Sequence, residues 1–98
     1  MSEVKSRIEN VIKSVEHPEI NYTLFELGML DDIEITEQEV NLTLKVPMLG
    51  VPIRDYLVQK IVQAVKQEAD IKVNVSITEM NESERIKFMQ MAQEAWRG

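Results

Sequence analysis

Three carboxylates stand close together in the first half of the sequence, at Asp31, Asp32 and Glu34. Paired carboxylates can act as general acid and base when both reach the same reacting group. Residues 30–36 have the pattern of a strand, on which neighbouring side chains point to opposite faces. Asp31 and Asp32 are therefore expected to be solvated strand-end residues. The sequence contains no nucleophile–base pair, phosphate-binding glycine loop or zinc motif, and we expect a non-enzyme.

The single histidine, His17, precedes Pro18 and Glu19. One His and one Glu, without a Cys or a second His, are too few ligands for a metal site. The sequence has no cysteine at all, which excludes disulfides, thiolate catalysis and thiolate metal ligands within the chain. We expect His17 to be a partly exposed residue behind a helix, where the helix dipole favours a positive charge.

A second candidate site is the segment Pro47–Pro52, which joins the end of a predicted strand to the start of a predicted helix. Such a position places ligands near the unpaired N–H groups of a helix N-terminus. Met48, Leu49 and Val51 make this segment apolar. Two interpretations stay open: Leu49 and Val51 fill core space under the helix, or an exposed Met-Leu-Gly-Val tip docks on another protein.

Periodicity predicts the elements that position these residues. Apolar residues at helical spacing indicate a helix over residues 2–15, and Pro18 ends it. Residues 17–28 are expected to be irregular, with Gly28 turning the chain into the next strand. The remaining elements are strands over residues 30–36, 40–46 and 71–77, a helix from Pro52 to about Ala69, and a last helix capped by Asn81.

The last helix is expected to bury four residues, Ile86, Met89, Ala92 and Trp96, with Trp96 packed against nearby Met or Phe side chains. The order α-β-β-α-β-α predicts an α/β fold of the two-layer α+β type, in which one domain spans residues 1–98. Strands one and two should form an antiparallel hairpin, and a single crossover helix makes strand three parallel to strand two. Helices should cover mainly one face of this small mixed sheet.

Charge is distributed unevenly along the chain. The net charge is −6, and between Glu16 and Glu39 there are eight acids and no Lys or Arg. This segment should repel nucleic acid and anionic membranes. It is either a solvated acidic surface or a docking surface for a basic partner. No apolar run approaches a membrane span, and residues 1–15 lack a signal-peptide stretch, so the expected location is cytoplasmic.

The order of His17-Pro18-Glu19, Leu27-Gly28, a strand hairpin and then Val51-Pro52 before a helix resembles a known family. It is similar to the iron–sulfur cluster assembly domain of SufT, of PaaD and of the front of Mrp/ApbC-type carrier proteins. The resemblance covers roughly residues 4–79. Family members usually carry Asp-Pro-Glu at the first motif and Cys-Pro at the last.

This resemblance implies an accessory or adaptor protein in iron–sulfur cluster assembly or delivery, which contacts assembly or client proteins. With Val51 in place of the Cys, no cofactor is expected on this chain alone, although a transient cluster could be held with a partner's ligands. The residues that the resemblance implies in partner binding are His17, Pro18, Glu19, Gly28, Val51 and Pro52, and the apolar tip adds Met48 and Leu49 to the expected partner-binding set. Lys45 and Val46 stand where the family often has a polar Thr.

Two alternatives remain. The resemblance to PaaD implies an accessory subunit of a multicomponent enzyme, which also works by contact. A small α-β-β-α-β order is also similar to KH-type domains, but such a module needs a GxxG loop and a basic face. Gly50 is the only glycine of its turn and the first half is acidic, so nucleic-acid binding is disfavoured.

Overall fold

The computed structural model describes residues 2–50 and 53–96. The elements follow the predicted order, and each boundary lies within two residues of the expected one. They are α1 (Ser2–Lys13), β1 (Leu30–Ile35), β2 (Glu39–Val46), α2 (Ile53–Glu68), β3 (Lys72–Glu79) and α3 (Glu82–Ala95).

The three strands form one mixed sheet in the order β1-β2-β3. β1 and β2 are antiparallel, with Leu30 opposite Leu44, and β3 runs parallel to β2, with Val40 opposite Val73. The mixed sheet of an α+β fold is therefore confirmed. β2 is the central strand, and this strand order could not be determined from the sequence alone.

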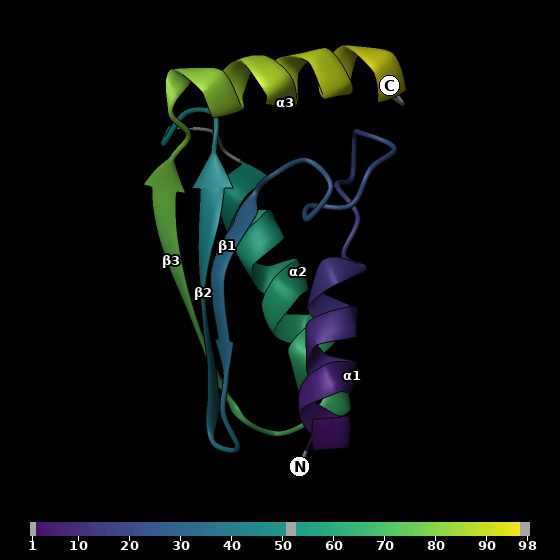
Figure 1. Cartoon of the computed structure of the whole chain (residues 1–98), viewed down its shortest axis with the longest axis vertical. Coiled ribbons are helices and arrows are strands. Elements are labelled where there is room, and N and C mark those ends of the chain that lie inside the picture. The colour runs from purple at the N-terminus through teal and green to yellow at the C-terminus, as the bar shows by residue number, and fades with distance from the viewer. Residues whose placement is uncertain (1, 51–52, 97–98) are drawn as a thin grey trace.

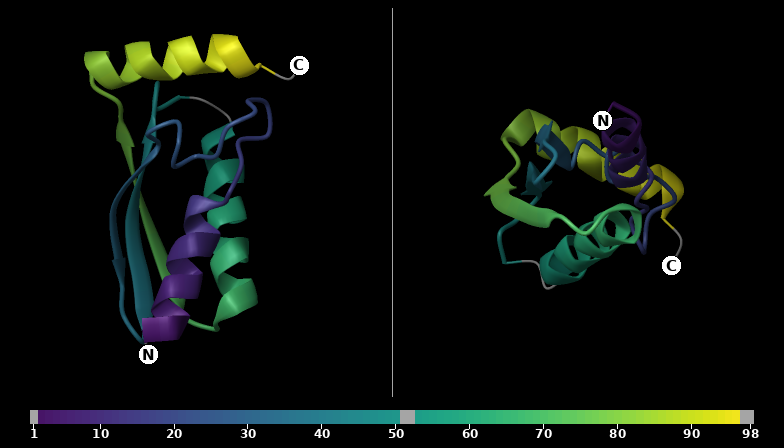
Figure 2. Two further views of the ribbon diagram at one scale, coloured as in Figure 1. Left: turned by 45° about the vertical axis from the view of Figure 1, so that its right-hand side comes forward. Right: turned by 90° about the horizontal axis from the view of Figure 1, so that it is seen from below.

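The helices occupy two different positions around this sheet (Figures 1 and 2). α1 and α2 lie side by side against one face, as predicted for the helices of a two-layer fold. α3 instead lies across the end of the sheet at which β2 and β3 finish. The uncovered face carries polar side chains that are half-buried, among them Asn41, Thr43 and Asn74.

The core lies between the sheet and the two helices that cover it. The four apolar residues of β2 alternate with polar ones and are buried, with Leu44 and Val46 fully enclosed. Ile8 and Ile12 come from α1, and Ile61 comes from α2. Burying each such side chain stabilises the fold by about 1.5–3 kcal/mol. This core holds the C-terminal end of β2 in place, and the candidate site begins in the segment directly after it.

The hairpin between β1 and β2 turns without an Asn-Gly pair because Thr36 supplies the missing hydrogen bonds. Its hydroxyl accepts the backbone N–H groups of Gln38 (3.3 Å) and Glu39 (3.1 Å), and donates to the Glu39 carbonyl (3.1 Å). A Thr side chain that bonds the backbone two or three residues on is a recognised turn former. The turn therefore holds the register of the hairpin.

β1 is irregular between Asp31 and Glu34, where its register against β2 shifts. Asp32 has a φ of 51°, in the left-handed region that Asp tolerates better than most residues. The shift allows Leu30 and Ile35 to be buried on one face although they are an odd number of positions apart. A bulge of this kind also discourages another strand from pairing with the edge.

α3 departs from the prediction in the face that it buries. Its capping box is present, with the Asn81 side chain accepting from the Glu84 N–H. However, Phe88 and Ala92 are its buried residues. Three residues expected on the buried face are about half exposed: Ile86, Met89 and Trp96. The prediction was wrong because α3 crosses the end of the sheet and does not pack flat upon it, so it buries a narrower stripe.

Within residues 2–50 and 53–96, none of the helices has the length and apolar character needed to cross a membrane.

Candidate functional site

The segment after β2 presents apolar side chains to solvent. Met48 and Leu49 are 59% and 46% exposed. The Leu49 carbonyl accepts a hydrogen bond from Arg54 Nη1 (2.9 Å), and the Pro47 carbonyl accepts one from Arg85 Nε (3.0 Å). The exposure of Leu49 therefore favours the interpretation in which these residues form an exposed tip over the one in which Leu49 fills core space under the helix. Val51 and Pro52, the other predicted site residues here, lie outside the described residues.

His17 is buried, at 5% exposure, which corrects the expectation of a partly exposed residue. Its Nδ1 accepts the backbone N–H of Glu19 (3.0 Å), and its ring centroid lies 6.5 Å from that of Phe88. Since Nδ1 is an acceptor, the neutral imidazole carries its proton on Nε2. His17 thus shapes the turn around Pro18 and leaves the Glu19 side chain exposed.

The chain from Glu16 to Gly28 is irregular, as predicted, but it is firmly hydrogen-bonded. The Leu24 N–H donates to the Val15 carbonyl (2.8 Å), and Glu16 and Thr23 form an antiparallel bridge. Gly28 has a φ of 76°, which explains why a glycine stands before β1. These contacts make the segment a fixed surface.

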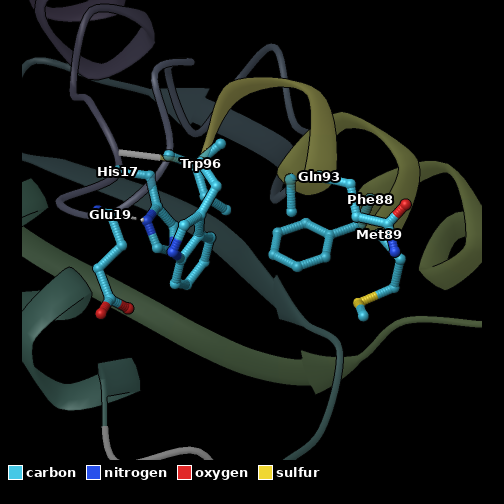
Figure 3. A pocket seen from close by; sticks show the side chains of 8 residues that line it. His17, Glu19, Phe88, Met89, Gln93 and Trp96 are labelled. Carbon is cyan, nitrogen blue, oxygen red and sulfur yellow. Dashed lines mark hydrogen bonds between the residues drawn. The ribbon is translucent and has the colours of Figure 1, made fainter. Parts of the chain in front are cut away.

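A pocket of about 500 Å³ lies between this segment and α3 (Figure 3). It is lined by His17, Glu19, Ile20, Phe88, Met89, Ala92, Gln93 and Trp96. Half-exposed Met89 and Trp96 stand at its edge, so the pocket opens to solvent. Its walls are mainly apolar. The part contributed by α3 was missed from the sequence, because Met89 and Trp96 were assigned to the core.

α3 connects the two predicted site segments. Near its N-terminus, Arg85 holds the Pro47 carbonyl. At its C-terminal end, the Ala95 carbonyl accepts the N–H of Asn21 (2.8 Å), and Ile20 bridges to Trp96. The segments around His17 and Met48 therefore lie at the same end of the molecule, below one helix (Figures 1 and 2). We call this the α3 end.

Lys45 anchors the N-terminus of α3 to the sheet. Its Nζ lies 2.6 Å from Glu84 Oε2 and 3.2 Å from Asp31 Oδ2. Hydrogen bonds from the Lys45 ammonium hold the pKa of Glu84 and the pKa of Asp31 below their ordinary values. The hydrogen bond to Glu84, followed by that to Asp31, raises the pKa of Lys45. Lys45 therefore has a structural role, and the adjacent Val46 is buried in the core.

The donor atoms of the α3 end do not fit an iron site. Among residues 2–50 and 53–96, no group of three or more His, Cys, Asp or Glu side chains could hold a metal ion. The sequence has no thiol, and His17 Nδ1 already accepts a backbone hydrogen bond. The α3 end instead presents exposed apolar side chains on segments that are held in place by backbone hydrogen bonds.

Comparisons with known proteins agree with this fold. A family model described as "Iron-sulfur cluster assembly protein" matches residues 5–88. Among solved structures, a domain of unknown function, DUF59, from Bacillus anthracis is similar with a TM-score of 0.69. It is 14% identical in sequence, and the match covers 93% of this chain and 93% of that chain. At this identity the likeness concerns the fold. No curated protein matches the sequence.

Proposed function

Because this chain belongs to the iron–sulfur cluster assembly protein family, we propose that it serves cluster assembly or delivery as a non-catalytic adaptor. In this role it binds assembly proteins or client proteins through the α3 end. Family membership supports a part in cluster assembly. The mode of action is inferred from the residues below.

The observation that carries the proposal is the absence of a thiol from the sequence, together with exposed apolar side chains just before the usual position of the family's cysteine. Met48 and Leu49 are exposed, and they precede Val51, which stands in place of the family's Cys, by three and two residues. Cluster iron is bound in proteins mainly by Cys thiolates, and the chain has none to offer. Apolar side chains that remain exposed in a fixed loop favour contact with another protein. A cluster passing this point would take its ligands from the partner.

The acidic surface supports the same conclusion and disfavours nucleic acid. Residues 16–39 contain eight acids and no Lys or Arg. Phosphate binding depends on neutralisation by basic side chains, so a segment of this charge disfavours DNA and RNA, although Lys45 pairs with one of its acids, Asp31. The segment complements a basic protein surface, and such complementarity raises the rate of association and selects the partner.

The test is anaerobic affinity capture of the tagged protein from its native cells, followed by mass spectrometry. We expect enrichment of cluster scaffold, carrier or iron–sulfur client proteins over a tag-only control. Enrichment of the subunits of one multicomponent enzyme would support the accessory-subunit alternative. Recovery of neither group would leave the chain with the family's fold and without the proposed role.

A further inference from the structure

The pocket between α3 and residues 17–20 is a feature that the family match does not fully include. The match ends at Phe88, whereas Met89, Ala92, Gln93 and Trp96 of the pocket lie after it. Its volume of about 500 Å³ falls within the range of roughly 300–1,000 Å³ typical of ligand pockets. The family match therefore does not indicate what binds in this pocket, and the chemistry of the lining residues has to indicate it.

The walls favour apolar side chains. His17, Phe88 and Trp96 contribute rings, and Figure 3 shows the rings of His17 and Trp96 on one side of the space and Phe88 and Met89 on the other, with the Glu19 carboxylate turned outward. A small polar ligand needs several convergent polar groups, and His17 Nδ1 is already bonded to the Glu19 N–H. Half-exposed Trp and Met at an open edge are typical of protein contact sites.

The charge around the pocket limits which protein can occupy it. Among the described residues that line the pocket, none is Lys or Arg, and Glu19 is an exposed acid at its edge. The net charge of the sequence is −6, so the charge at the pocket has the same sign as the net charge of the chain. A second copy of the chain carries the same Glu19 and the same net charge of −6, so electrostatic repulsion disfavours it as the occupant.

We infer that the pocket receives the apolar face of a basic amphipathic segment of a partner protein, with Lys or Arg next to its apolar residues. A helix presents such residues at spacings of three and four, and these can enter an apolar groove together. The inference rests on the proposed adaptor function and names the kind of partner surface that the α3 end would bind. The flanking bases would lie against Glu19, the acid among the described residues that line the pocket.

Trp96 offers a direct readout, because it is the only tryptophan in the sequence and it lines the pocket. The probe is a short amphipathic helical peptide with Leu on one face and Lys on the other. Two control peptides replace every Lys by Glu, or every Leu by Ser. We expect only the Lys–Leu peptide to shift Trp96 emission to shorter wavelength, with weaker binding at high salt.

Matched variants then locate the contact. Met89→Ser should weaken binding by about fivefold or more, as truncation of an interface anchor does, whereas Ile86→Ser on the same helix should not. Glu19→Gln should weaken binding by about two- to fivefold at low salt, whereas Glu94→Gln should not. All four residues are exposed, so circular dichroism should show every variant folded.

Equal binding of the Lys and Glu peptides, or binding that is indifferent to both Met89 and Glu19, would overturn the inference. Absence of any emission change with the Lys–Leu peptide would also overturn it. An emission shift that depends on protein concentration alone would assign the pocket to a second copy. If any of these results occurs while the affinity capture still recovers iron–sulfur proteins, the pocket is not the partner-binding site, but the proposed adaptor function is retained.

Discussion

At the scale of single residues, His17 shows how one side chain shapes the candidate site. Replacing it with Ala removes the acceptor of the Glu19 N–H and the ring that faces Phe88. We expect His17→Ala to lower the free energy of unfolding by about 1–3 kcal/mol. The measurement is urea unfolding followed by circular dichroism.

His17→Asn is the matched control, because an Asn oxygen can accept the N–H two residues further on. This variant should recover part of the stability that Ala loses. Equal losses in the two variants would mean that the hydrogen bond to Glu19 is unimportant. The burial of His17 could not be predicted from its neighbours, because it depends on Phe88, which lies far along the chain.

Lys45 gives a prediction with a defined pH dependence. In the folded chain the pKa values of Asp31 and Glu84 lie below their ordinary values of 3.8 and 4.5. The folded state therefore binds fewer protons than the unfolded state as these groups titrate. Their stabilising contribution is complete above the ordinary pKa values and is lost as pH falls below them.

Lys45→Met should lower stability at neutral pH and reduce the loss that the wild type shows on acidification from about pH 5 to pH 2. Because the pKa of Lys45 is raised above 10.5, its own contribution is complete below that value and is lost above it. Urea unfolding across this pH range checks the slope, with Lys87→Met, an exposed residue of α3, as the control. Identical acid slopes for wild type and Lys45→Met would contradict the assignment.

Gly28 was predicted as a turn residue, and its φ is 76°. A residue with a side chain should therefore lower the stability of the fold at this position. No atom lies within 4 Å of an added Cβ, so Gly28→Ala tests backbone strain without a clash. We expect a loss of roughly 1–2 kcal/mol. Gly50 has equally open surroundings without a left-handed φ, so Gly50→Ala should be neutral or slightly stabilising. The melting temperatures of the two variants test this prediction. Equal changes in melting temperature would contradict the claim that the left-handed φ of Gly28 requires a glycine.

At the scale of elements, α3 is the part that organises the site. Asn81→Ala removes the side chain that caps its first turn. The expected cost is about 1 kcal/mol, or a fall in melting temperature of about 4–8 °C for a domain of this size. Ser83→Ala in the same turn is the control. A melting temperature unchanged by Asn81→Ala would mean that the cap does not stabilise the helix.

The elements themselves were predictable because their signals are local. Alternation in β2, the helical spacing of Ile8 and Ile12, and the capping box at Asn81 each depend on a few adjacent residues. The buried face of α3 was predicted incorrectly because it depends on where the helix docks. Phe88 and Ala92, four residues apart, would have marked the correct stripe.

At the scale of the whole molecule, the segments predicted to bind partners come together although they are separated in sequence. Among residues 2–50 and 53–96, seven of the eight exposed large apolar side chains belong to segments at the α3 end, which includes the first turn of α2: Phe25, Met48, Leu49, Tyr56, Ile86, Met89 and Trp96. The family resemblance identified two of these segments. The contribution of α3 could not be predicted, because the pocket exists only once the helix crosses the end of the sheet.

The measurement that tests the central claim most directly compares Leu49→Asp with Val4→Asp in the anaerobic capture. Each variant places a charge on an exposed apolar position, Leu49 at the α3 end and Val4 on α1 at the other end of the molecule. Both should fold as the wild type does, because neither side chain is buried. We predict that Leu49→Asp loses the iron–sulfur proteins and that Val4→Asp retains them. Equal recovery with the two variants would contradict the claim that this protein acts through its α3 end.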